Sequence, residues 1–117
     1  MQDFIQQAIR TESDAKPAGV ASRLLHAGMG MATEAGEFLD QLKKHLYYGK
    51  TLDQTNLMEE IGDLLWYIAL AMDDLDTDFA SEMDRVIRKL KVRFPEKFNV
   101  VDANMRDLDA ERAELER

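Results

Sequence analysis

Small and apolar side chains recur between Leu25 and Leu46 in a pattern that leaves few alternatives to one long helix. They follow one another at alternating steps of three and four residues: Leu25, Gly28, Ala32, Ala35, Leu39, Leu42 and Leu46. This spacing is typical of a helix that packs along its length against another helix. It predicts a helix from about Ser22 to Tyr48, ended by Gly49.

Helices are favoured over the rest of the chain as well. Only two prolines and six glycines interrupt 117 residues, and no segment alternates apolar and polar side chains as a half-buried strand would. The expected helices cover about residues 3–10, 22–48, 56–75 and 78–94, with a polar tail helix within 105–117. A loop is expected over Ser13–Gly19, and residues 96–103 are expected to be irregular. We therefore predict a single all-α domain of residues 1–117, a four-helix-type bundle with a C-terminal tail helix, completed by oligomerisation.

Two of the expected helices indicate which sides face the core. The helix over 56–75 is apolar on most of its circumference, which is typical of a central helix in a bundle. Its main stripe consists of Leu57, Ile61, Leu64, Leu65, Ile68, Met72 and Leu75, with Trp66 and Leu70 on the far side. The helix over 78–94 is expected to bury Phe79, Met83, Val86, Ile87 and Leu90 and to end before Pro95.

The composition excludes several classes of protein. The chain has no cysteine, so disulfides, zinc–thiolate sites and cysteine nucleophiles are excluded. Its first residues are polar, unlike a signal peptide, and no apolar run approaches the ~18 residues of a membrane span. A net charge of −8 argues against nucleic acid as a partner and favours divalent cations. We expect a cytoplasmic protein that binds neither membrane nor nucleic acid.

Two pairs of carboxylates stand at helical spacing. Glu34 and Glu37 lie three residues apart, which makes them surface neighbours on a helix, and Glu60 and Asp63 repeat the arrangement in the next helix. The first pair can be a solvated face, but small and apolar neighbours favour a cleft; these are Ala27, Gly30, Met31 and Phe38. The second pair lies on a largely apolar helix and needs compensation, either from Lys43 or Lys44 or from a metal ion.

The two pairs should meet, because a connection of about seven residues makes the two long helices an antiparallel hairpin. Their depths along the hairpin differ by roughly 10 Å at ~1.5 Å per residue. A slanted crossing, or a later start of the second helix, would have to absorb this difference. Three or four carboxylate oxygens from two helices suit Mg²⁺ or Mn²⁺, which prefer hard ligands.

Complementary charge follows in the next helix. Five basic residues and no acidic one stand between Arg85 and Arg93. They can form a solvated face or salt bridges to Glu82 and the tail, or Lys89 and Arg93 can contact phosphate oxygens beside the metal. Metal-bound carboxylates together with cations favour cleavage of a phosphoanhydride.

These motifs resemble one known family. The segment from Met31 to Phe38, with Glu34 and Glu37, and the segment from Glu59 to Tyr67, with Glu60 and Asp63, resemble the ExxE and ExxD motifs of the MazG-like all-α nucleoside triphosphate pyrophosphohydrolases. The segment from Lys89 to Pro95 is similar to the Lys-Leu-x-x-Arg-x-Pro stretch of the same family. The resemblance spans roughly residues 24–98.

The resemblance implies hydrolysis of a nucleoside triphosphate, a dNTP or a modified nucleotide, to the monophosphate and pyrophosphate. It implies Mg²⁺ held by Glu34, Glu37, Glu60 and Asp63, phosphate contacts from Lys89 and Arg93, and a homodimer or homotetramer. Thr33 stands where many members have a further glutamate, which leaves open the number of metals and the general base. Val86 stands where many have asparagine, so recognition of the sugar or base can differ.

Further candidates for substrate binding are His26 and Tyr67, which can contact a nucleobase or belong to the packing of the bundle. Two other functions remain open: a phosphoribosyl-ATP pyrophosphohydrolase, and a non-catalytic helical interaction or toxin–antitoxin protein that keeps the fold. A ferritin-like di-iron site is disfavoured, because neither His26 nor His45 has the Glu-x-x-His spacing of such sites.

Overall fold

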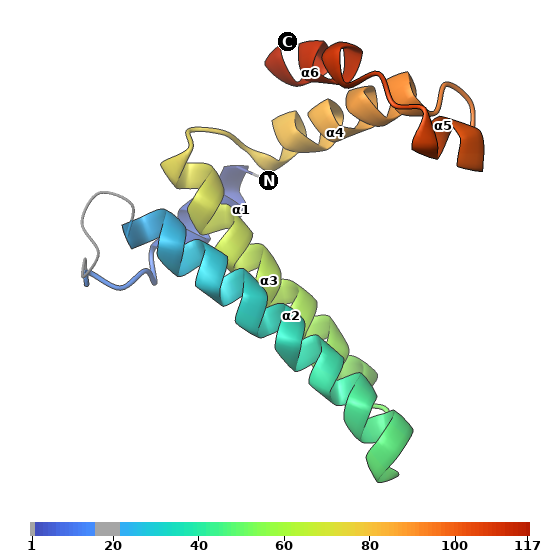
Figure 1. Ribbon diagram of the computed structural model, residues 1–117. Helices are drawn as coiled ribbons and strands as arrows, with labels where there is room; N and C mark the ends of the chain where they lie inside the picture. Colours follow the sequence, from blue (N-terminus) through green and yellow to red (C-terminus); the bar gives the residue numbers. More distant parts are fainter. Residues whose placement is uncertain (1, 16–21) are drawn as a thin grey trace. The chain divides into compact units, whose positions relative to one another are not determined.

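The computed structural model describes residues 2–15 and 22–117, and within these ranges all regular structure is helical, which confirms the predicted all-α class (Figure 1). The chain divides into two compact units, Met1–Asp78 and Phe79–Arg117. The first contains α1 (Gln2–Ile9), α2 (Ser22–Tyr48) and α3 (Gln54–Asp74), and the second contains α4 (Phe79–Arg93), α5 (Val100–Asn104) and α6 (Leu108–Glu116). None of the described helices has the length and apolar character needed to cross a bilayer.

The hairpin of α2 and α3 is the scaffold of the first unit (Figure 1). The predicted bounds of α2 are confirmed at both ends, and Gly49 follows it with φ of +68°, a left-handed conformation that glycine adopts without a steric penalty. Asp53 caps the start of α3, where its side chain accepts a hydrogen bond of 3.0 Å from the backbone N–H of Asn56. The predicted loop of residues 13–19 lies only in part within the described residues, of which Ser13–Ala15 are irregular.

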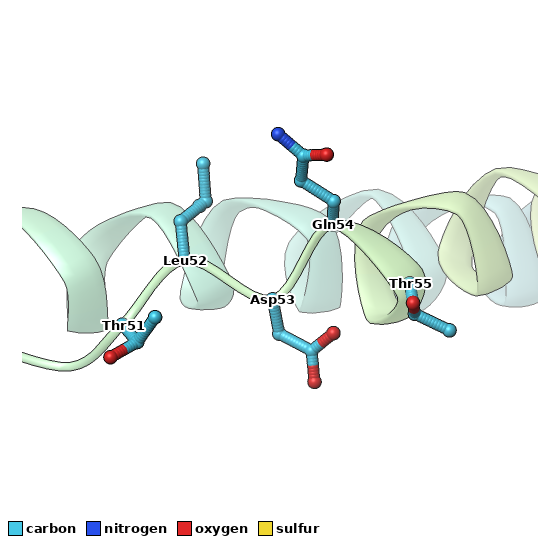
Figure 2. Close-up of a pocket in the computed structure, with 5 residues that line it drawn as sticks. All are labelled: Thr51, Leu52, Asp53, Gln54 and Thr55. Carbon is cyan, nitrogen blue, oxygen red and sulfur yellow. The ribbon is translucent and has the colours of Figure 1, made fainter.

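The connection between α2 and α3 brings the two helices into register. The backbone N–H of Lys50 donates to the carbonyl of Lys44 at 3.2 Å, and the carbonyl of Lys50 lies 2.8 Å from Nδ1 of His45. The chain thus folds back at the end of α2. Thr51, Leu52 and Asp53 then lead into α3, and with Gln54 and Thr55 they line a pocket (Figure 2). We expected a slanted crossing or a late start of α3, but α3 begins two residues earlier than predicted, at Gln54. An irregular stretch covers more distance per residue than a helix and absorbs the difference in depth.

The core of the first unit lies where α1 packs on α3 and α3 on α2. Its buried apolar residues are Ile5, Ala8, Ala27, Ala69 and Leu70. The predicted stripe on α2 does not form this core, since Leu25 is 53%, Leu39 64% and Leu46 70% exposed. Instead α2 packs through the face that carries Ala27 and Gly30.

The orientation of α3 also differs from the expectation. Ile61, Leu65 and Leu75 of the predicted inward stripe are exposed, whereas Leu70, placed on the far side, is fully buried. The reason is that only two other described helices of this unit, α1 and α2, pack on α3, and two helices cannot surround a third. They cover the side that carries Ala69 and Leu70 and leave Ile61 and Leu65 exposed.

An ion-pair cluster fixes the start of α2. The guanidinium of Arg23 forms two hydrogen bonds with the carboxylate of Glu12, at 2.7 and 2.9 Å, and lies 2.6 Å from the carboxylate of Asp73 at the end of α3. Both carboxylates raise the pKa of Arg23. The cluster therefore joins the segment after α1 to both long helices.

The second unit is built by α4 and α6. Arg93 forms two hydrogen bonds with Glu111, at 2.9 and 3.2 Å, and Arg106 contacts the same carboxylate, which is only 3% exposed. Residues 96–103 were expected to be irregular, but α5 forms from Val100, because the side chain of Asn99 accepts a hydrogen bond of 2.7 Å from the backbone N–H of Asp102. Met83, Val86 and Ile87, which we expected to be buried, are exposed within this unit.

Candidate metal centre

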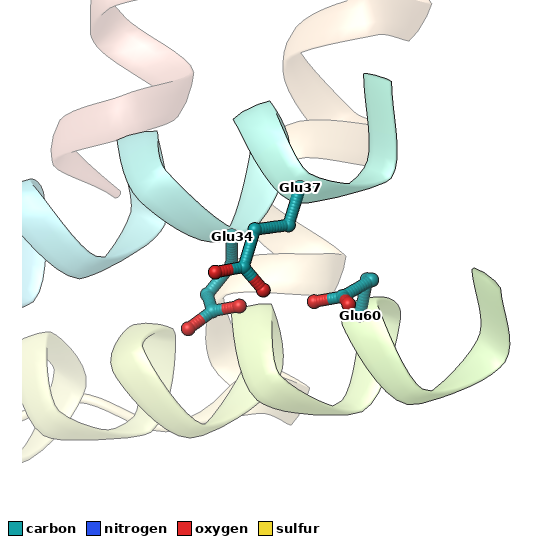
Figure 3. A group of neighbouring side chains, drawn as sticks. All are labelled: Glu34, Glu37 and Glu60. Atoms are coloured by element: carbon teal, nitrogen blue, oxygen red, sulfur yellow. The ribbon is translucent and has the colours of Figure 1, made fainter. Parts of the chain in front are cut away.

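Three carboxylates converge between α2 and α3. Glu34 and Glu37 project from successive turns of α2, and Glu60 projects from α3 toward them (Figure 3). One oxygen of each residue lies within 4.8 Å of one oxygen of both others. This confirms the expectation that acidic motifs of the two helices meet at the same depth of the hairpin.

Two oxygens of this cluster are buried and lack a hydrogen-bonding partner among the described residues: Oε2 of Glu34 and Oε2 of Glu60. Glu60 is 7% exposed, and its other oxygen accepts a hydrogen bond of 3.0 Å from Nδ2 of Asn56. Buried carboxylate oxygens are costly unless a donor or a cation compensates them. Unpartnered hard donors at this spacing therefore fit a divalent cation such as Mg²⁺.

Mutual repulsion and burial change the acidity of the cluster. Burial, the largest cause, and the neighbouring carboxyl groups of Glu60, Glu37 and Asp63 together raise the pKa of Glu34 to about 7. The pKa of Glu37 is also raised, chiefly by Glu60. Lys43 and Lys44, the candidates for compensation by salt bridges, instead pair with Asp40, at 3.3 and 2.8 Å. Of the two alternatives for compensation, lysine salt bridges or a metal ion, the lysine pairs with Asp40 therefore favour the metal ion.

The fourth predicted ligand, Asp63, does not belong to the group of three that the described residues form. It lines a pocket of about 310 Å³ together with Glu34, Trp66 and Tyr67. A second, largely apolar pocket borders Glu34 and Glu60 and extends toward Phe38 and Leu64. Asp63 is therefore adjacent to the carboxylate cluster and faces the space beside it.

Aromatic rings form one wall of the pocket beside Asp63. Trp66 and Tyr67 meet edge to face with ring centres 4.9 Å apart, and His26 meets both, at 6.4 and 5.7 Å. The ring of Tyr67 packs directly on Gly30, where an added methyl group would overlap it. His26 and Tyr67 were candidates either for contact with a nucleobase or for packing. The structure shows that their rings pack on each other and that Tyr67 also lines the pocket.

The predicted phosphate-binding residues belong to the second unit. Lys89 is half-buried in α4, and Arg93 is engaged by Glu111, whose carboxylate raises the pKa of Arg93. The neighbouring basic residues are also paired, Arg85 with Glu82 and Arg88 with Asp84 and Glu114. The basic residues of α4 were expected to form a solvated face or salt bridges, or to contact phosphate. Salt bridges to Glu82 and to the tail form within the unit.

Sequence reasoning missed two residues that shape the cluster. Asn56 precedes Glu60 by one helical turn, and this spacing was the available signal for the hydrogen bond between them. Gly30 was taken only as a small neighbour of the acidic pair, although its missing side chain makes room for Tyr67.

The fold and the cluster define a class, an all-α protein with three converging carboxylates, a set that fits a divalent cation, between the helices of a hairpin. A family model for the MazG nucleotide pyrophosphohydrolase domain matches residues 25–98, more than half of the chain. The chain belongs to this family. Its three-carboxylate cluster, the aromatic pocket and the start of α4 all fall within the matched residues.

A curated relative is the Gene 37 protein of Mycobacterium phage L5, which is 34% identical to this chain over 74 residues. The match covers 60% of this chain and 65% of that protein, so the chain spans slightly less than two thirds of the length of its relative. No solved structure matches the chain.

Proposed function

We propose that this protein hydrolyses a nucleoside triphosphate, a dNTP or a modified nucleotide, to the monophosphate and pyrophosphate. The observation that carries the proposal is the convergence of Glu34, Glu37 and Glu60 with two buried oxygens that lack partners. Membership of a nucleotide pyrophosphohydrolase family supports it. Mg²⁺, or Mn²⁺ in its place, is the proposed cofactor, since both prefer carboxylate oxygens.

The chain supplies the remaining parts of such a reaction. Glu34, Glu37 and Glu60 would hold Mg²⁺, which would supply neutralisation of phosphate charge and a lower pKa for water. Asp63 borders the pocket beside the cluster, and we assign it to orienting or deprotonating the attacking water. Tyr67, with His26 and Trp66 packed against it, offers a face on which a nucleobase can stack. Lys89 and Arg93 are proposed to contact phosphate oxygens.

The proposed setting is a homodimer or homotetramer in the cytoplasm. Apolar side chains exposed along the hairpin support self-association. Arg93 can serve a phosphate only if it leaves Glu111, which makes Lys89 the first candidate for this role.

The test is release of pyrophosphate from a panel of canonical and modified nucleotides in the presence of Mg²⁺. We expect activity on at least one member and a loss of ~100-fold or more in Glu37→Gln and in Asp63→Asn. Asp40→Asn is the matched control, because Asp40 lies one turn beyond Glu37 on α2 and pairs with lysines outside the cluster. Release of orthophosphate alone would contradict the reaction. Failure to bind Mg²⁺ in a titration would favour a non-catalytic interaction protein.

A further inference from the structure

Trp66, which lines the aromatic pocket, forms a hydrogen bond with a residue outside the hairpin of α2 and α3. The indole Nε1 of Trp66 donates a hydrogen bond of 3.0 Å to Oγ1 of Thr11, the residue that ends the first turn after α1. The same hydroxyl donates to the carbonyl of Ala8 at 2.9 Å. Since its proton is used for that carbonyl, the oxygen of Thr11 presents a lone pair in a fixed direction to the indole.

The helix that precedes Thr11 is packed into the core. Ile5 and Ala8 of α1 are buried, at 1% and 6% exposure, and α1 packs on α3, the helix that carries Trp66. The backbone N–H of Thr11 also donates to the carbonyl of Ala8, at 3.1 Å. The position of the hydroxyl is therefore set by packed backbone rather than by a flexible side chain.

Trp66 transmits this support to the pocket. Its ring lines the pocket with Glu34 and Asp63, and it meets the ring of Tyr67 edge to face. An indole without its hydrogen bond can rotate about its side-chain bonds, and this would alter the edge-to-face contact through which Trp66 restricts Tyr67. The hydroxyl of Thr11 thus adds a directional restraint on Trp66 to the ring contact that His26 makes with it.

We propose that Thr11 is a positioning residue, which holds Trp66 in the orientation that shapes the nucleotide pocket. The inference rests on the proposed function of that pocket, although Thr11 itself touches neither the carboxylate cluster nor the space beside it. Thr11 acts on binding of the nucleotide and leaves binding of the metal unchanged.

The test compares Thr11→Val, which keeps the shape and removes the hydroxyl, with Thr11→Ser, which keeps the hydroxyl. Trp66 is the only tryptophan of the chain, so its fluorescence reports its environment without interference. We expect Thr11→Val to shift the emission maximum and to raise KM for the nucleotide by about 2–10-fold, with kcat within about twofold, the effect of one lost hydrogen bond. Thr11→Ser should restore both values, and Mg²⁺ affinity should be the same in all three proteins.

Thr55→Val is the control, because Thr55 is an exposed residue in the first turn of α3, about three turns before Trp66. A double-mutant cycle keeps the inference testable if Thr11→Val destabilises the protein: in a Trp66→Phe background the Thr11→Val change should no longer affect KM. Unchanged emission and KM in Thr11→Val, or equal defects in Thr11→Val and Thr11→Ser, would overturn the inference. If the wild-type protein releases no pyrophosphate, the proposed function fails. The role of Thr11 is then decided by the dissociation constant of the nucleotide, measured through quenching of Trp66.

Discussion

Glu34 is the single residue at which burial and charge conflict most directly. Its carboxyl group faces three other acidic side chains, and one of its oxygens is buried without a partner among the described residues. The pKa of Glu34 is about 7 in the metal-free folded protein and near 4.5 in the unfolded chain. Between these two pH values the folded protein holds a proton at Glu34 that the unfolded chain has released. This protonation stabilises the metal-free fold below pH 4.5, and the contribution is lost as the pH rises through about 7.

Metal binding should therefore depend on pH. A cation must displace the proton of Glu34, so we expect the affinity for Mg²⁺ to fall by up to about tenfold per pH unit below pH 7 and to level off above it. Calorimetric titrations at several pH values, in buffers of different ionisation enthalpy, measure both the affinity and the released proton. The dependence should largely disappear in Glu34→Gln. An affinity that does not change between pH 5.5 and 8, values chosen about one unit or more from that pKa, would contradict the expectation.

Gly30 and Gly28 provide a second test with single residues. A methyl group at Gly30 would overlap the ring of Tyr67, whereas one at Gly28 would meet no atom within 4 Å. We expect Gly30→Ala to destabilise the protein by about 1–3 kcal/mol, the usual cost of overpacking. Gly28→Ala should stabilise the helix by up to ~1 kcal/mol. Urea unfolding measures both changes, and equal effects of the two substitutions would show that Tyr67 is not seated on Gly30.

At the scale of the elements, helices are the part of this structure that the sequence predicts best. The bounds of α2 follow from its periodicity and from Gly49. Helix α3 begins two residues before its predicted start, because Asp53 caps it. The short α5 was not predicted, since it depends on a cap by Asn99 and not on any apolar pattern. Periodicity also identified the apolar stripe on α2 but could not tell that Leu25, Leu39 and Leu46 lie outside the core of the hairpin.

The ion pairs between α4 and α6 predict how the second unit responds to acid. Arg93, and then Arg106, lower the pKa of Glu111 to about 2, below its ordinary value of 4.5. The stabilisation is complete above pH 4.5 and is lost as the pH falls through about 2. We expect the melting temperature to fall over this range by less in Glu111→Gln than in the wild type. Circular dichroism melts from pH 7 to 2 measure the difference, and parallel pH profiles would exclude this role for Glu111.

At the scale of the whole molecule, apolar surface is left exposed along the hairpin. It includes Leu25, Met29, Leu39, Leu46, Met58 and Ile61, on both long helices. Soluble monomers rarely expose so many large apolar side chains on one pair of helices. The predicted dimer or tetramer would cover them.

Self-association can be tested at Leu39, which lies in the middle of α2 and is 64% exposed. Leu39→Glu should shift the protein toward the monomer, because a charge would have to be desolvated in the interface. Leu39→Met, which keeps the apolar character and the volume, should associate as the wild type does. Sedimentation velocity over a range of concentrations measures the species. A wild-type protein that stays monomeric at high concentration would refute the expectation.

The candidate site was only partly predictable from the sequence. The four carboxylates follow from residue spacing on two helices, and three of them converge in the structure. The hydrogen bonds from Asn56 to Glu60 and from Trp66 to Thr11 depend on side-chain rotamers and on the packing of α1, which spacing does not encode. The engagement of Arg93 by Glu111 likewise depends on where α6 packs within its unit.

The connection between α2 and α3 restricts which changes in chain length the carboxylate cluster can tolerate. The hydrogen bonds at Lys50 and the cap at Asp53 leave little slack between them, so the length of this connection decides which turn of α3 stands opposite Glu34. A deletion of one residue there would slide α3 by a fraction of a turn and separate the carboxylates, although every glutamate would remain in place. We therefore expect a change in the length of this connection to damage the cluster as much as a substitution of its glutamates, although the connection contributes none of the three.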